Sequence, residues 1–196
     1  MIVNTITQFR VFRPIPINEE IEVFHNSLII TETDPYGIIT YANRRFLSLM
    51  GYTEKEIIGM PHYINRHPDM PHSLFKEMWK VIQSKNIWRG YIKNLTKNGK
   101  YYWVMAWIQP KLNDKKEIIG YIAIKKFAYP KMVQKIESDF MSLPRVEREN
   151  LKYPYGGKLE FGSDFIGSKY LDQEPEETIA MINQREHDPK SIIKDY

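Results

Sequence analysis

Three strand-like runs near the middle of the chain restrict its fold more than any other feature. They are rich in β-branched and aromatic residues, and they span Trp88–Leu95, Tyr101–Lys111 and Ile118–Phe127. Asn98-Gly99 joins the first two, and this dipeptide is the strongest short signal for a hairpin turn. Alternate positions of the middle run are largely apolar on both faces, so helices or a partner must cover each side. The sequence therefore predicts an antiparallel sheet with both faces buried.

The segment before these runs adds a second hairpin and several short helices. Two further strand-like runs, Leu28–Thr33 and Ile38–Tyr41, flank the turn composition Asp34-Pro35-Tyr36-Gly37. Three signals predict helices: apolar residues at helical spacing, a capping-box pattern from Thr53 to Glu56, and prolines at helix starts. The predicted helices span 43–50, 53–59, 73–84 and 130–141, and a last one starts at Pro175. Together these elements predict an α+β fold with a five-stranded antiparallel sheet and short helices on one face.

A polar loop, Asn65–Pro71, lies between two of the predicted helices. Pro68 and Pro71 restrict the backbone, so Arg66, His67 and Asp69 are expected to be held in place. A guanidinium, an imidazole and a carboxylate on one stiff loop can bind a ligand's amide edge or an anion. Equally, Asp69 can cap the next helix and pair with Arg66, and the residue types alone leave both interpretations open.

Composition excludes several classes of protein. The 196 residues include no cysteine, so thiolate metal sites, iron–sulfur clusters and cysteine nucleophiles are excluded. Residues 1–141 carry 20 Lys/Arg and 13 Asp/Glu, and residues 142–196 carry 8 and 11, which indicates a basic domain with an acidic extension. The lysines are isolated rather than clustered, so nucleic-acid binding is not predicted.

The same sequence has no signal-peptide pattern and no apolar run near the roughly 20 residues that a membrane helix needs. We therefore expect a cytoplasmic protein without direct membrane insertion. It also lacks nucleotide-binding glycine motifs and a serine nucleophile motif, so we expect no enzyme activity.

Two stretches, Asp34–Asn43 and Gly51–Gly59, resemble the PAS sensory domain family over residues 28–127, about half of the chain. Within that family, Arg66–Pro71, Trp88-Arg89-Gly90, Asn94, Asn98-Gly99 and Tyr102-Trp103-Val104 resemble the aerotaxis and energy-taxis receptor branch. The resemblance implies a PAS fold with an N-terminal cap (1–27), a sensory domain (28–127), a flanking helix (128–144) and an acidic C-terminal extension (145–196).

The resemblance also implies FAD as a cofactor, bound between the helices and the sheet. Its cofactor-binding positions correspond here to Arg66, His67, Asp69, Trp88 and Asn94. A tryptophan can wall in an isoalloxazine ring and an amide can pair with its polar edge, although Trp88 can equally be a core aromatic. For His67, a loop hydrogen bond to backbone is expected ahead of ligand contact.

By resemblance, the chain is a redox or energy sensor that relays the flavin's state to a membrane-bound methyl-accepting chemotaxis-type transducer or another signalling protein. A homodimer is compatible with this role. Three alternatives stay open: a haem-binding gas sensor with His62, His67 or His72 as axial ligand, a cofactor-free interaction module, and a flavoenzyme.

Overall fold

One six-stranded antiparallel sheet, in the order β2-β1-β5-β4-β3-β6, organises the computed structural model, which describes residues 13–24 and 28–159. The strands are β1 (Ile29–Thr33), β2 (Ile39–Ala42), β3 (Trp88–Leu95), β4 (Tyr101–Leu112), β5 (Ile118–Phe127) and β6 (Gly156–Lys158). The five predicted strands and the α+β class are thus confirmed. The sixth strand, β6, comes from the C-terminal extension and pairs with the edge of β3.

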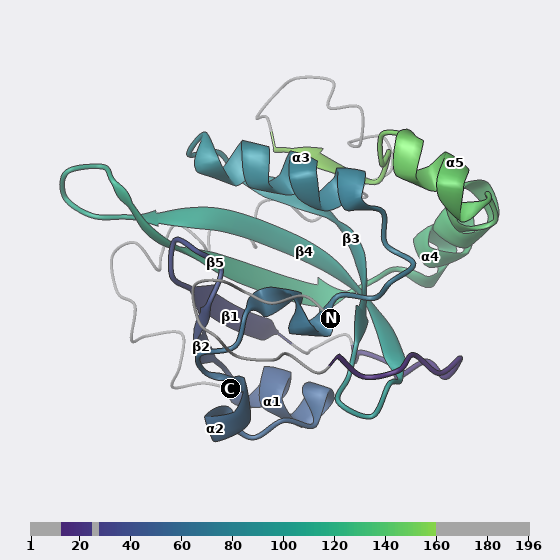
Figure 1. Ribbon diagram of the computed structural model, residues 1–196, viewed down its shortest axis with the longest axis horizontal. Coiled ribbons are helices and arrows are strands. Elements are labelled where there is room, and N and C mark those ends of the chain that lie inside the picture. Colours follow the sequence, from purple (N-terminus) through teal and green to yellow (C-terminus); the bar gives the residue numbers. More distant parts are fainter. Residues whose placement is uncertain (1–12, 25–27, 160–196) are drawn as a thin grey trace.

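Short helices connect β2 to β3 and cover one face of the sheet (Figure 1). They are α1 (Arg44–Met50), α2 (Glu54–Ile57), the 3-10 helix η1 (His62–Asn65) and α3 (His72–Gln83). The side chain of Asn43 caps α1 by accepting a hydrogen bond from the Phe46 amide, and Gly51 ends it with a φ of 73°. The predicted capping box from Thr53 to Glu56 is confirmed, although α2 ends at Ile57 rather than at Gly59.

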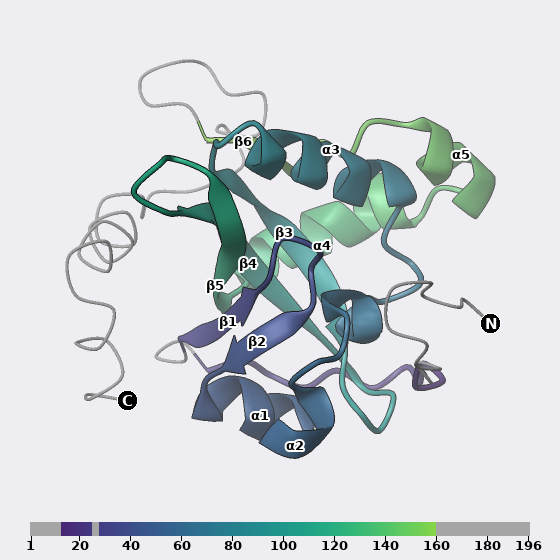
Figure 2. The ribbon, with the colours of Figure 1, turned by 60° about the vertical axis from the view of Figure 1, so that its left-hand side comes forward.

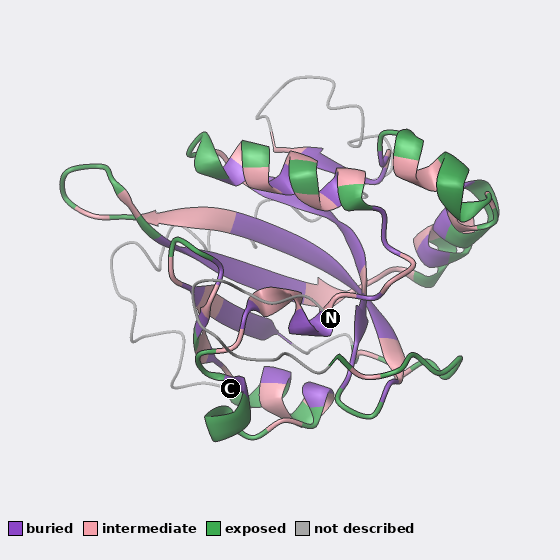
Figure 3. Ribbon diagram, viewed as in Figure 1, coloured by how far each residue is buried: buried purple, intermediate pink, exposed green. Residues whose placement is uncertain are grey.

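The other face of the sheet is covered by the segment that follows β5. This segment contains α4 (Pro130–Ile136), a π-helix η2 (Glu137–Met141) and α5 (Arg145–Asn150), and α4 lies behind the sheet in Figure 2. Val133 and Ile136 of α4 and Phe140 of η2 are buried, so these two helices cover the second apolar face of the sheet. Figure 3 shows the result: β3, β4 and β5 are buried over most of their length, and the turn between β4 and β5 is exposed.

The described N-terminal segment runs along the β3–β4 hairpin. Ile17 donates its amide to the Gly99 carbonyl at 2.9 Å, and Glu20 pairs with Tyr101 in a parallel bridge. A Cβ at Gly99 would lie 2.1 Å from the Ile15 carbonyl oxygen, so glycine is required for this approach. The predicted domain boundaries stay predictions, and the helix expected from Pro175 lies outside the described residues.

Candidate ligand-binding site

A cavity of about 860 Å³ lies between α3, η1 and the sheet. This volume is within the range of roughly 300–1,000 Å³ that small-molecule sites occupy. Its apolar walls come from α3 and from the sheet: Phe75, Met78, Trp79, Ile82, Ile92, Ile108, Tyr121 and Ala123. Most of these side chains are buried, so the inner part of the cavity is apolar, and the polar groups among them set its chemical character.

Two amides give the inner wall unsatisfied hydrogen-bonding capacity. Asn94 projects from β3 and Asn65 from the end of η1, and both side chains are nearly fully buried. Within the described residues, the Nδ2 atoms of Asn65 and Asn94 have no hydrogen-bond partner, and neither does the phenol oxygen of Tyr63. Buried donors without partners are costly, so these three atoms indicate a place for a ligand's acceptors.

A second polar group, formed by Thr31, His62 and Lys125, lines the same cavity. His62 Nε2 lies 3.0 Å from the Thr31 hydroxyl and 3.3 Å from Lys125 Nζ. Burial, and then the charge of Lys125, hold the pKa of His62 well below its usual range, so the imidazole is neutral. Burial alone lowers the pKa of Lys125 to about 7. Neither His62 nor Thr31 can supply the negative charge that a buried ammonium needs.

The cavity edge is basic. Arg13, Lys76 and Arg145 line it and are exposed, and Arg66 lines it while half-buried. Among the described residues, Glu149 is the only carboxylate in the lining. Such an edge suits a phosphate-bearing or otherwise anionic ligand.

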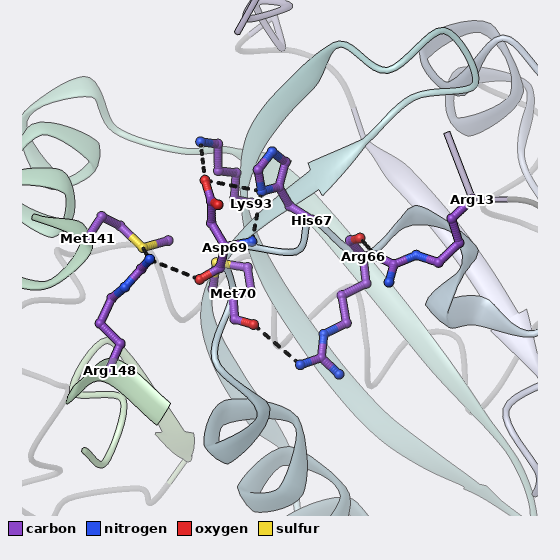
Figure 4. A network of polar contacts seen from close by, with 8 residues as sticks. All are labelled: Arg13, Arg66, His67, Asp69, Met70, Lys93, Met141 and Arg148. Carbon is purple, nitrogen blue, oxygen red and sulfur yellow. Dashed lines mark hydrogen bonds and ion pairs between the residues drawn. The ribbon is translucent and has the colours of Figure 1, made fainter. Parts of the chain in front are cut away.

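The loop before α3 is held by a network that differs from the predicted cap (Figure 4). Arg66 donates to the Met70 carbonyl at 3.3 Å, and its guanidinium lies 3.7 Å from the centroid of the Phe75 ring. Asp69 pairs with Lys93 of β3 at 3.2 Å rather than with Arg66. The residue at the start of α3 is Pro71, without a side-chain cap, so the interpretation of Asp69 as a helix cap is wrong.

His67 turns away from the cavity into the same loop network. Its Nδ1 accepts a hydrogen bond from the Asp69 amide at 3.1 Å, as expected for a loop-stabilising histidine. Burial, and next the charge of Lys93, lower the pKa of His67 to about 4. The ring is therefore neutral at pH 7, and its 3.3 Å approach to the Asp69 carboxylate is not an ion pair at that pH.

Trp88 lies in the core beside the cavity rather than in its lining. Its indole crosses Gly90 and Gly156: a Cβ at either glycine would lie 2.5 Å from the ring. The exposed fraction of Trp88 is 1%, and its ring packs against the paired strands β3 and β6. This placement favours the core interpretation of Trp88 over direct ligand contact.

Of the five sequence-predicted residues, the structure brings Arg66 and Asn94 to the cavity, and their backbones pair in an isolated antiparallel bridge. His67, Asp69 and Trp88 support the surrounding structure. Lys125 was not predicted from the sequence, Asn65 was identified only as the start of the polar loop, and His62 was considered only as a possible haem ligand. Strand alternation was a usable signal for Lys125, since it shares a face with Tyr121 and Ala123.

His62 and His72 also line the cavity, from different elements. In residues 13–24 and 28–159, there is no group of three metal-ligating side chains. Over the same ranges, every helix is too short or too polar to span a bilayer.

Residues 39–124 match the family model described as the PAS fold. The aerotaxis receptor of Escherichia coli (strain K12) is 36% identical over 118 residues, which cover 60% of this chain and 23% of that protein. The nitrogen fixation regulatory protein of Klebsiella pneumoniae is 30% identical over 100 residues, covering 51% of this chain and 20% of that protein. The chain thus spans less than a quarter of the length of either relative.

Among solved structures, the dark structure of the blue-light photoreceptor Aureochrome1 LOV aligns with a TM-score of 0.51. The sequence identity is 19%, and the alignment covers 57% of this chain and 83% of that chain. At this identity, the similarity concerns the fold.

Proposed function

We propose that this chain, whose residues 39–124 form a PAS domain, binds FAD in the cavity beneath α3 and acts as a redox sensor in signal transduction. The observation that carries the proposal is that one cavity combines buried amides without hydrogen-bond partners and a basic edge. The amides of Asn65 and Asn94 suit the hydrogen-bonding edge of an isoalloxazine ring. The cations at the edge suit the diphosphate of a dinucleotide.

The relatives support a signalling role rather than turnover. By their names, they are an aerotaxis receptor and a nitrogen fixation regulatory protein. When bound, a flavin supplies two-electron redox chemistry, and the residues described here bind it, orient it and exclude water. A change in its charge is expected to shift the population of two packings rather than to drive catalysis.

A route for that signal runs through α5. Arg145 and Glu149 line the cavity, and the Glu149 carboxylate accepts the His72 amide at 2.9 Å. Arg148 donates to the Asp69 carbonyl at 3.1 Å. The loop that carries Arg66 is thereby tied to the C-terminal segment. We propose that this segment passes the signal to a membrane-bound methyl-accepting chemotaxis-type transducer or another signalling protein.

A haem-binding alternative would need a free histidine nitrogen in the cavity. His62 Nε2 is already engaged by Thr31 and Lys125, and His67 Nδ1 accepts the Asp69 amide. These contacts argue against His62 and His67 as axial ligands, whereas His72 also lines the cavity, so the visible spectrum of the chain separates haem from flavin.

Equilibrium titration of the full chain with FAD, FMN and riboflavin tests the proposal. FAD is expected to bind at least about tenfold more tightly than FMN, since the second phosphate meets the basic edge. Arg66→Met should cost about tenfold in FAD affinity and little in riboflavin affinity, and Asn94→Leu should weaken all three. Arg44→Met, which removes an exposed arginine of α1, is the control. Equal affinity for FAD and riboflavin, or no binding, would overturn the proposal.

A further inference from the structure

Lys125 is a buried cation on the inner wall of the cavity. Its exposed fraction is 1%, and its neighbours across the sheet are Ile29 on β1 and Ala106 on β4. Among the described residues, no carboxylate forms an ion pair with it. An ammonium in this position costs several kcal/mol unless a negative charge joins it.

The groups that face Lys125 from the covering helices do not supply that charge. From η1, His62 offers Nε2 at 3.3 Å, and from α1, the Phe46 ring centroid lies 5.4 Å from Nζ. Thr31 of β1 shares the same histidine nitrogen. Glu149 is the only carboxylate among the described lining residues, and it lies on α5, where its carboxylate accepts the His72 amide. A ligand that gains negative charge beside Lys125 would therefore supply what the described residues do not.

We propose that Lys125 takes up one of the two protons that accompany two-electron reduction of FAD in this cavity, and stabilises the reduced ring by its charge. This inference rests on the proposed binding of FAD. The balance is two electrons from an external reductant and two protons from solvent. One proton binds a ring nitrogen, leaving the reduced ring with one negative charge, and the other converts the Lys125 amine to an ammonium.

The acid–base state of Lys125 suits this role. Since burial lowers its pKa to about 7, the amine is about half protonated at neutral pH before any negative charge forms beside it. A negative ring raises the affinity of the amine for a proton, so reduction draws one in. The neutral His62 places its Nε2 atom 3.3 Å from Lys125 Nζ, and this contact helps to hold the amine in position.

The test is an equilibrium redox titration of the FAD-loaded full chain between pH 7 and 9. Dithionite supplies the electrons, and a dye of known potential reports the ratio of reduced to oxidised flavin. The variants are Lys125→Met, which removes the amine, and Lys125→Arg, which keeps the charge but cannot lose its proton. Lys126→Met is the control, because its register partner Met105 lies on the opposite sheet face.

In the wild type and in K126M, the ratio of reduced to oxidised flavin at fixed potential should fall about 50-fold from pH 7 to 8 and nearly 100-fold from pH 8 to 9, because Lys125 in the oxidised protein is about half protonated at pH 7 and neutral at pH 9. In K125M, the ratio of reduced to oxidised flavin should fall about tenfold per pH unit. At pH 7 this ratio should be about tenfold lower than in the wild type, which is equivalent to about 30 mV for a two-electron couple. In K125R, the ratio should also fall about tenfold per pH unit. At pH 7 it should stay above that of K125M, because arginine keeps a positive charge beside the reduced ring.

A K125M protein with the wild-type slope and ratio would overturn the inference while leaving FAD binding intact. If K125M fails to retain FAD, K125R decides: a 100-fold slope there overturns the inference, and a tenfold slope supports it. A wild-type chain that does not bind FAD would instead overturn the proposed function, and this inference with it.

Discussion

Lys93 Nζ lies 3.2 Å from Asp69 Oδ2, so an ion pair ties strand β3 to the loop that carries Arg66 into the cavity. The Asp69 side chain is 45% exposed, and exposed pairs contribute little to stability. We therefore expect the Lys93–Asp69 ion pair to position Arg66 rather than to stabilise the fold.

Lys93→Met is predicted to lower the free energy of unfolding by less than about 1 kcal/mol and to weaken FAD binding several-fold. Urea unfolding and FAD titration measure the two effects. Lys97→Met breaks a surface pair with Glu56 that lies outside the cavity lining, and it should leave FAD affinity unchanged. An unaltered FAD affinity in Lys93→Met would contradict the positioning role.

Gly90→Ala is predicted to destabilise the chain by roughly 2 kcal/mol or more, because the new Cβ would lie 2.5 Å from the Trp88 ring and 2.7 Å from the Gly156 Cα. Trp88→Phe should cost less and should retain FAD, since the indole does not line the cavity. Thermal unfolding and the flavin absorbance of the purified variants check both. Loss of FAD in a stably folded Trp88→Phe protein would restore the ligand-contact interpretation.

Features of the fold that depend on neighbouring residues were predicted from the sequence, whereas contacts between distant segments were not. The two hairpins and the capping box of α2 follow from local signals such as Asn98-Gly99 and the pair Thr53 and Glu56, and they were predicted correctly, whereas Asn43, expected as the first residue of a helix, is the N-cap of α1. Strand β6 was missed because Gly156-Gly157-Lys158 has no β-propensity of its own and is ordered by the edge of β3. The pairing of Asp69 was misassigned because Lys93 is distant in sequence. Lys125 was missed because a lone lysine near a strand end usually faces solvent.

Stability is predicted to fall as the pH drops from about 6.5 to about 4. The folded-state pKa of His67, about 4, lies below its ordinary value of 6.5, so the unfolded chain binds more protons in this window. His62, whose pKa is also lowered, acts in the same direction. The prediction is that His67→Gln flattens the pH dependence of urea unfolding between pH 6.5 and 4. An unchanged dependence would show that His67 is not held neutral by the fold.

In the FAD-free chain, Lys125→Met is predicted to raise the free energy of unfolding at pH 7 by roughly 2–4 kcal/mol. The folded-state pKa of Lys125, about 7 against an ordinary 10.5, means that wild-type stability increases as the pH rises between those values. The variant lacks this contribution, so the difference between the two proteins should shrink from pH 7 to pH 10. Urea unfolding with Lys126→Met as control measures it. A destabilised Lys125→Met protein would contradict the assignment of Lys125 as an unpaired buried cation.

The most direct test of the central claim is the visible absorbance of the full chain, purified and then incubated with FAD, before and after dithionite. If the chain is a flavin sensor, a two-banded yellow spectrum persists after removal of free FAD and bleaches on reduction. A sharp, intense band near the violet edge would instead indicate haem. A chain that stays colourless after incubation with FAD would contradict the flavin-sensor account and favour a cofactor-free interaction module.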